Sequence, residues 1–325
     1  MGVPLRVFTS ARAALETVRG TSLTPTRIIY AEEFTLDHTV ATIRPEELRG
    51  SYEGVNAAEA GPETSSVTMA GRVSYDDLPW HANMFFKKVQ TPTGAGPYVY
   101  TFLPTNTSDD LNTFTLQLGD SAAIATSPGV QLSYGFADEL NLHFEKNDDG
   151  AVTFNARYLF AKALTQITAF TGSLSDRTTT PASANVTTIK IDETTIGTTP
   201  DTAVTAVDFT MQIGPVPFYT LDGTLAANAV YRPDYRRWTA EITRQYANAT
   251  EFSAYVAKTI KKIRVTTTTG ANAIIVLDLY GVWTGRSYSD VDGIITEVLT
   301  LEPVYDTTST SSVSLVVTNG IAALT

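Results

Sequence analysis

Cysteine is absent from this 325-residue chain, which excludes disulfides, thiolate catalysis and cysteine-ligated metal sites. Basic residues are scarce as well: 23 Lys and Arg stand against 34 Asp and Glu, for a net charge of −11. No run of Lys or Arg is longer than two residues. Proteins that hold nucleic acid normally present a basic face, so we expect no stable nucleic-acid binding. An acidic wall repels phosphates and is therefore compatible with passing contact without adhesion.

Long apolar runs are also missing. None approaches the roughly 18 residues that a membrane helix needs, and residues 1–14 contain no apolar core of a secretory signal. We therefore expect no membrane partner. Hydrophobic residues make up 43% of the chain, as in globular proteins, and its Thr, Tyr and Phe favour half-buried strands. The length suits two domains of about 150 residues each.

Alternation of apolar and polar residues is the main fold signal. Leu140, Leu142 and Phe144 alternate with polar residues, which is typical of a strand with one face exposed. The polar face, a candidate lining of a lumen, consists of Glu139, Asn141, His143 and Glu145. Similar apolar or aromatic runs predict further strands over 27–30, 67–75, 98–102, 114–118, 130–144, 151–160, 186–191 and 238–244.

Three helices are predicted. One spans 11–19 and ends at Gly20, and a second follows a cap at Asp76 or Asp77. The apolar stripe of the second helix is Leu78, Ala82, Phe85 and Phe86. For the third, Asn248 and Glu251 have the spacing of a capping box. Its apolar stripe is Phe252, Tyr255, Val256 and Ile260.

Two polar connections, 37–66 and 212–237, are longer than ordinary loops. Both mix charged groups with aromatic or apolar ones, and Tyr and Arg are enriched at interface hot spots. We expect contacts between subunits or between rings at Arg44, Glu46, Glu47, Arg49, Tyr52, Phe218, Tyr219, Tyr231, Arg232, Tyr235 and Arg236. The alternative is a pair of solvated surface loops.

The chain contains a weak internal repeat. Residues 33–36 (Glu-Phe-Thr-Leu) recur as 208–211 (Asp-Phe-Thr-Met), and each is followed by a long connection, a strand and a capped helix. Both halves then reach an Asp-Gly hairpin turn, at 149–150 and at 292–293. This order predicts a first domain over 1–165, a Thr- and Ser-rich junction over 166–200 and a second domain over 201–325. Residues 89–113 form an insertion without a counterpart in the second half.

No catalytic motif is present, so we expect no enzyme activity, no cofactor and no metal. His38, His81 and His143 are never at ligand spacing. The acidic turns at 147–150 and 290–293 lack the glutamate that would complete an EF-hand calcium loop. Helix capping explains Asp76 and Asp77. The aromatics of 98–102 predict strand core more strongly than a sugar-binding platform.

The order of these pieces resembles the tail tube proteins of long-tailed bacteriophages (siphophages), in the form that carries two tube domains per chain. The resemblance runs from 16–21 (Glu-Thr-Val-Arg-Gly-Thr) through 71–75 (Gly-Arg-Val-Ser-Tyr) and 135–142 (Gly-Phe-Ala-Asp-Glu-Leu-Asn-Leu) to 313–319. It implies a mainly β fold of two tandem β-sandwich domains, each with one flanking helix.

The resemblance also implies a structural role. Three copies would form a ring with pseudo-sixfold symmetry, and stacked rings would form the hollow tube through which DNA passes. The implied partners are other copies of the chain and the tail tip or baseplate, tape measure and tail terminator proteins. The implied location is the virion, after assembly in the host bacterial cytoplasm. A secreted adhesin or carbohydrate-binding β-sandwich is the alternative, and a capsid decoration protein is a third possibility.

Overall fold

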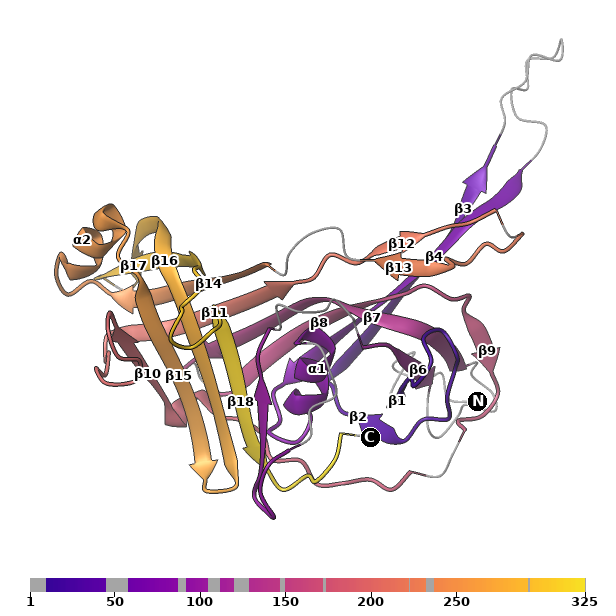
Figure 1. Ribbon diagram of the computed structural model, residues 1–325, viewed down its shortest axis with the longest axis horizontal. Coiled ribbons are helices and arrows are strands. Elements are labelled where there is room, and N and C mark those ends of the chain that lie inside the picture. Colours follow the sequence, from indigo (N-terminus) through magenta and orange to yellow (C-terminus); the bar gives the residue numbers. More distant parts are fainter. Residues whose placement is uncertain are drawn as a thin grey trace, which may run out of the picture.

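The fold is seen in a computed structural model (Figure 1). It describes residues 10–44, 58–86, 92–104, 112–119, 129–146, 150–171, 174–221, 223–231, 237–291 and 293–324. The predicted mainly β class is confirmed. Among the described residues, no helix is long and apolar enough to cross a membrane.

The elements of the first half are, in chain order, β1 (Ser10–Leu15), β2 (Arg27–Ile29), β3 (Glu33–Ile43), β4 (Glu59–Arg72), α1 (Leu78–Phe85), β5 (Tyr98–Phe102), β6 (Phe114–Gly119), β7 (Gly129–Glu145) and β8 (Val152–Phe160). The junction holds β9 (Thr165–Ile167), the short 3-10 helix η1 (Ala184–Val186) and β10 (Thr187–Asp192). The elements of the second half are β11 (Val204–Gln212), β12 (Val216–Phe218), β13 (Ala229–Tyr231), β14 (Arg237–Gln245), α2 (Thr250–Ala257), β15 (Lys261–Gly270), β16 (Ala273–Val291), β17 (Ile294–Pro303) and β18 (Val313–Asn319).

One antiparallel run of eight strands extends through both halves, in the order β3-β4-β8-β7-β11-β14-β17-β16. We call it the eight-strand sheet. The first four strands come from the first half and the last four from the second. If the four strands that each half contributes are numbered in chain order, both halves place them in the sheet in the order first, second, fourth, third. The order of elements in the predicted repeat is thus present in the sheet, and β7 pairing with β11 joins the two halves.

Each half adds an outer sheet that shares one long strand with the eight-strand sheet. The N-terminal part of β7 pairs with β6 and β9, and β6 continues through β1 to β2. The N-terminal part of β16 lies between β15 and β18. Strand β5, from the insertion predicted at 89–113, pairs with β18 at the far end of the chain. The insertion therefore extends the outer sheet of the second half.

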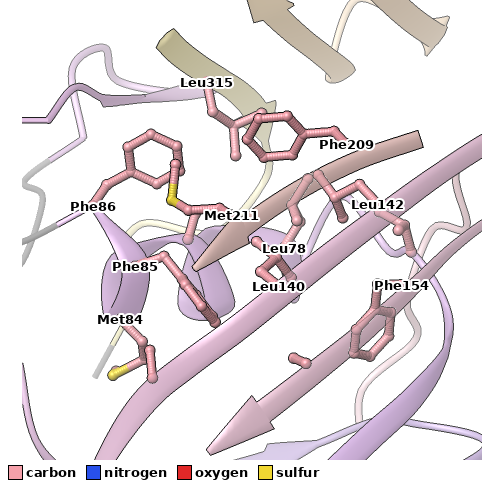
Figure 2. Packing of buried hydrophobic residues seen from close by; sticks show 14 of the residues in the cluster. Leu78, Met84, Phe85, Phe86, Leu140, Leu142, Phe154, Phe209, Met211 and Leu315 are labelled. Atoms are coloured by element: carbon pink, nitrogen blue, oxygen red, sulfur yellow. The ribbon is translucent and has the colours of Figure 1, made fainter. Parts of the chain in front are cut away.

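A single hydrophobic cluster spans the two halves. Figure 2 shows part of it, with Phe85 of α1 and Phe86 directly after it, Leu140 and Leu142 of β7, and Phe209 and Met211 of β11. All eight residues of α1 are buried, and the helix lies against β7, β5 and β18. The division into two domains stays a prediction, since the halves share both a sheet and a core.

The predicted helix over 11–19 is wrong: its first part is strand β1. Ala11 and Ala13 alternate with half-buried residues and pack against β6, so their small side chains fill a tight sheet interior. Burial there outweighs the helix propensity of alanine. The sequence is compatible with either a loop or an extended arm over 37–66, and the structure has the second. Strands β3 and β4 remain paired as far as Ile43 and Glu59, which makes it an extended arm.

The helix caps differ from the sequence-based prediction. Asp77 occupies the N-cap of α1, but its side chain makes no capping hydrogen bond and instead meets Arg27 and Arg177. The Asn248 carboxamide does accept a hydrogen bond from the Thr250 backbone N–H, at 2.9 Å. Glu251, however, turns inward to Lys261 and Trp283 and completes no capping box. Two buried donors outcompete an exposed backbone N–H for this carboxylate.

Candidate assembly surfaces

One face of the eight-strand sheet is largely polar. Residues that pair directly across antiparallel strands point to the same side, so the register can be followed from strand to strand. One such row is Glu33, Ala70, Asn155, Asn141, Thr210 and Thr239. A second row is Arg72, Thr153, His143, Asp208, Glu241 and Thr300. We call this side the polar face.

The four residues predicted to share one face of β7 lie on the polar face. Glu139, Asn141, His143 and Glu145 are half-buried, whereas the leucines and phenylalanine between them are buried. Three of the four are hydrogen-bonded across the seam to β11. Asn141 donates to Thr210 at 2.9 Å, the amide of Gln212 donates to Glu139 at 3.0 Å, and the His143 ring lies 2.5 Å from Asp208.

His143 is the only histidine on the seam between the described parts of the two halves. Partial burial alone would lower its pKa, but hydrogen bonds to Asp208 and Glu145 raise it above the usual 6.5. His81, in contrast, is packed inside the first half with its ring 2.6 Å from the Tyr158 hydroxyl. Burial, with the charge of Arg27, lowers the pKa of His81 to about 3. The structure brings none of the three histidines together as ligands.

Two strand edges of the eight-strand sheet lack a neighbour in the described part of the chain. Strand β3 pairs with β4 alone, and beyond Gly281 the strand β16 pairs with β17 alone. These edges lie at opposite ends of the sheet. Open edges of this length are templates for pairing with another chain.

The two long connections lie beside each other at the root of the arm (Figure 1). The hydroxyl of Tyr219 donates to the Glu63 carbonyl at 3.2 Å, and the Glu63 backbone N–H donates to the Leu225 carbonyl at 3.0 Å. Strands β12 and β13 pair to form a short hairpin within the second connection.

The predicted contact residues fall into three groups. Arg44 is exposed where the described part of the arm ends, and Phe218 and Tyr231 are exposed on β12 and β13. Tyr219 is half-buried, and its hydroxyl holds the second connection to the arm. Glu46, Glu47, Arg49, Tyr52, Arg232, Tyr235 and Arg236 lie outside the described residues.

The apolar stripe predicted for the third helix meets the core only through Tyr255, which is half-buried and packs against it. Glu251 and Ala254 of α2 are buried, whereas Phe252, Val256 and Ile260 are exposed. The predicted stripe thus has most of its apolar surface exposed in the single chain. Beside it stand exposed Tyr246 and Tyr288, which sequence reasoning missed because strand-end aromatics give no periodic signal.

Comparison with protein-family models finds no match for this chain, and comparison with curated proteins finds none either.

Proposed function

We propose that the chain is the structural subunit of a hollow tube, the tail tube of a long-tailed bacteriophage, and that its copies join through the edges of the eight-strand sheet. The observation that carries this proposal is the repeated strand order. Within the chain, the third strand of the first half (β7) pairs with the first strand of the second half (β11). The third strand of the second half (β16) and the first strand of the first half (β3) are the two open edges.

One kind of contact between copies would pair both open edges. Residues 282–291 of β16 would pair with β3 of the next copy as β7 pairs with β11, and the series closes when the ring is complete. A closed ring leaves no open end in the series of eight-strand sheets, which is how barrels avoid uncontrolled aggregation.

The strand count sets the size of the channel. Three copies would give a barrel of 24 strands, eight from each. At about 4.8 Å per strand its circumference is about 115 Å and its backbone diameter about 37 Å, and strand tilt widens it further. A barrel of about eight strands is filled by its own side chains, whereas one of 16 or more holds water. Three copies therefore leave room for a DNA duplex, and a single copy does not.

The polar face is suited to a channel wall that does not hold DNA. It is built largely of Thr, Asn and acidic side chains. Two of its arginines are ion-paired: Arg157 lies 2.6 Å from Asp138, and Arg72 lies 3.3 Å from Glu32. Duplex binding depends on unpaired cations that displace counterions, so DNA would pass along this wall without being held. We assign the contact between stacked rings to the arm, which projects beyond the sheet.

The pairing register can be tested because the chain has no cysteine. His143 faces Thr153 and Ser287 faces Val298, at equivalent places in the two halves. Asp208 lies opposite His143, and its counterpart in the first half is Glu33. The in-chain pair His143–Asp208 therefore corresponds to Ser287 of one copy and Glu33 of the next. Residues directly opposite in antiparallel strands have Cα atoms about 4.5–5.5 Å apart, within disulfide reach.

We expect the double variant Glu33→Cys with Ser287→Cys, oxidised after assembly, to give covalent dimers and trimers that stop at three. The matched control moves one cysteine by two residues, as Glu33→Cys with Ser289→Cys, and should cross-link much less. Single-cysteine variants should give no ladder. A ladder that stops at six refutes the trimeric ring, and an open-ended ladder refutes closure. Absence of cross-links together with no tubes in negative-stain micrographs refutes the proposed function.

A further inference from the structure

The two helices occupy the same place in their halves but differ in exposure. Helix α1 lies over β7, and α2 lies over β16, which is the corresponding strand. All of α1 is buried by the rest of the chain. In α2, Phe252 is 47% exposed and Val256 is 64% exposed. Figure 1 shows why: α1 lies inside the molecule, whereas α2 lies at its end, next to the open edge of β16.

An aromatic cluster stands at this open edge. The Arg286 guanidinium lies 4.5 Å from the ring centroid of Tyr288, 5.1 Å from that of Phe252 and 5.9 Å from that of Tyr246. Two bonds to Glu297, at 2.7 and 2.9 Å, hold the arginine in place. The rings are nonetheless 38–57% exposed. A fixed Arg among exposed aromatics is the composition of an interface hot spot.

The first half shows what covers the corresponding surface. Beside β7, strand β11 places Phe209 opposite Leu142 and Met211 opposite Leu140, on the side of the sheet where α1 packs. Both Phe209 and Met211 are fully buried. Figure 2 shows these side chains in the core with Phe86, the residue that follows α1. The join between halves is therefore sealed by an apolar pair from the incoming strand.

Strand β3 of a second copy would bring a similar apolar pair to the open edge. Phe209 and Met211 of β11 correspond to Phe34 and Leu36 of β3, which are only partly buried in the single chain. Leu142 pairs with Phe154 as Arg286 pairs with Leu299, so Arg286 takes the place of Leu142. In the register of the proposed ring, Phe34 of one copy thus lies opposite Arg286 of the other.

We propose that the aromatic cluster of Tyr246, Phe252, Arg286 and Tyr288 is the docking site for Phe34 of a second copy of this chain, with Leu36 following it toward Trp283. This inference rests on the ring of the proposed function and adds the residues that fasten it. The receiving residue differs from that of the in-chain join: an arginine framed by rings, rather than a leucine, receives the phenylalanine. That difference makes the contact between copies dependent on exposed rings held around a buried, ion-paired arginine.

The first test is a double-mutant cycle on association, measured by analytical ultracentrifugation. Phe34→Ala and Phe252→Ala should each weaken association up to about tenfold per contact, the size of an aromatic pair. Together they should weaken it no more than the stronger single change, because the two rings contact each other. Phe34→Ala with Phe218→Ala, an exposed ring on β12, is the matched control and should be additive.

The second test uses a substitution that leaves the stability of the fold unchanged. Phe252 is exposed, so it can be replaced by its photoreactive benzoyl derivative without disturbing the core. Illumination of assembled protein should join position 252 to the tryptic peptide of another copy that begins at Ile28 and contains Phe34. Multiplicative effects in the cycle, or adducts only at other peptides, overturn the inference even where the Glu33→Cys, Ser287→Cys ladder forms. If that ladder fails as well and no tubes form, the proposed function is refuted too.

Discussion

Replacing Leu142 by Ala tests whether the seam between β7 and β11 makes the two halves one cooperative unit. Leu142 is fully buried and lies opposite Phe209 on one side and Phe154 on the other. Removing three carbons costs about 2.4 kcal/mol at roughly 0.8 kcal/mol for each. The cavity adds to this, which brings the expected loss to about 3–4 kcal/mol.

Urea unfolding followed by pulsed hydrogen exchange, peptide by peptide, is the assay. With a slope of about 3 kcal/mol per M, the unfolding midpoint should fall by about 1 M. We expect the same shift in peptides of both halves, because they share one sheet and one core. Leu221→Ala, at a fully exposed position, is the control and should change nothing. The reasoning is refuted if only first-half peptides lose protection, since the halves would then unfold separately.

Three further changes have defined outcomes. His143→Gln should destabilise the protein more at pH 5.5 than at pH 9 in thermal melts. Because the pKa of His143 is raised in the folded protein, its protonated ring contributes its full stability below pH about 6.5, and this contribution is lost as the pH rises through the folded-state pKa. An equal loss of stability at both pH values would contradict the assignment. Lys261→Met should cost about 3 kcal/mol in chemical denaturation, because it removes the nearer of two cations beside the buried Glu251: Lys261 lies 3.2 Å away and Arg244 lies 3.7 Å away. Adding Glu251→Gln should recover part of the loss, and no recovery would count against a charge effect. The third change replaces 41–62 by Asn-Gly, which closes the hairpin at the pair formed by residues 40 and 63. Micrographs should then show rings that no longer stack. Normal tubes would show that the arm is not the connector between rings.

The sequence predicted the parts of the fold in which local pattern and burial agree. The alternation over 139–145 placed the polar and buried faces of β7 correctly. The recurrence of 33–36 at 208–211 identified two strands that do occupy equivalent places in the sheet. In both cases a period-2 pattern reports directly on a half-buried strand.

The failures have a different physical origin. The 11–19 segment looks helical because alanine and leucine favour helices, but its burial is decided by β6, about 100 residues away. The pairing of β5 with β18, more than 200 residues apart, has no local signature. The stripe on α2 has the right period, but a pattern does not say whether its apolar face is covered by its own chain.

Strand β3 carries two tasks on one continuous backbone. Its first residues, from Glu33 to Leu36, form the open edge of the sheet, and the rest runs on into the arm as far as Ile43. A hydrogen-bonded strand is stiff, so a neighbour that pairs with the edge also restricts the angle at which the arm leaves the sheet. In the proposed tube, closure of a ring would thus fix the orientation of its arms. A growing tube would then bind the next ring most tightly after the ring at its end has closed. The order of assembly, ring closure before stacking, would then follow from the fact that β3 takes part in both contacts.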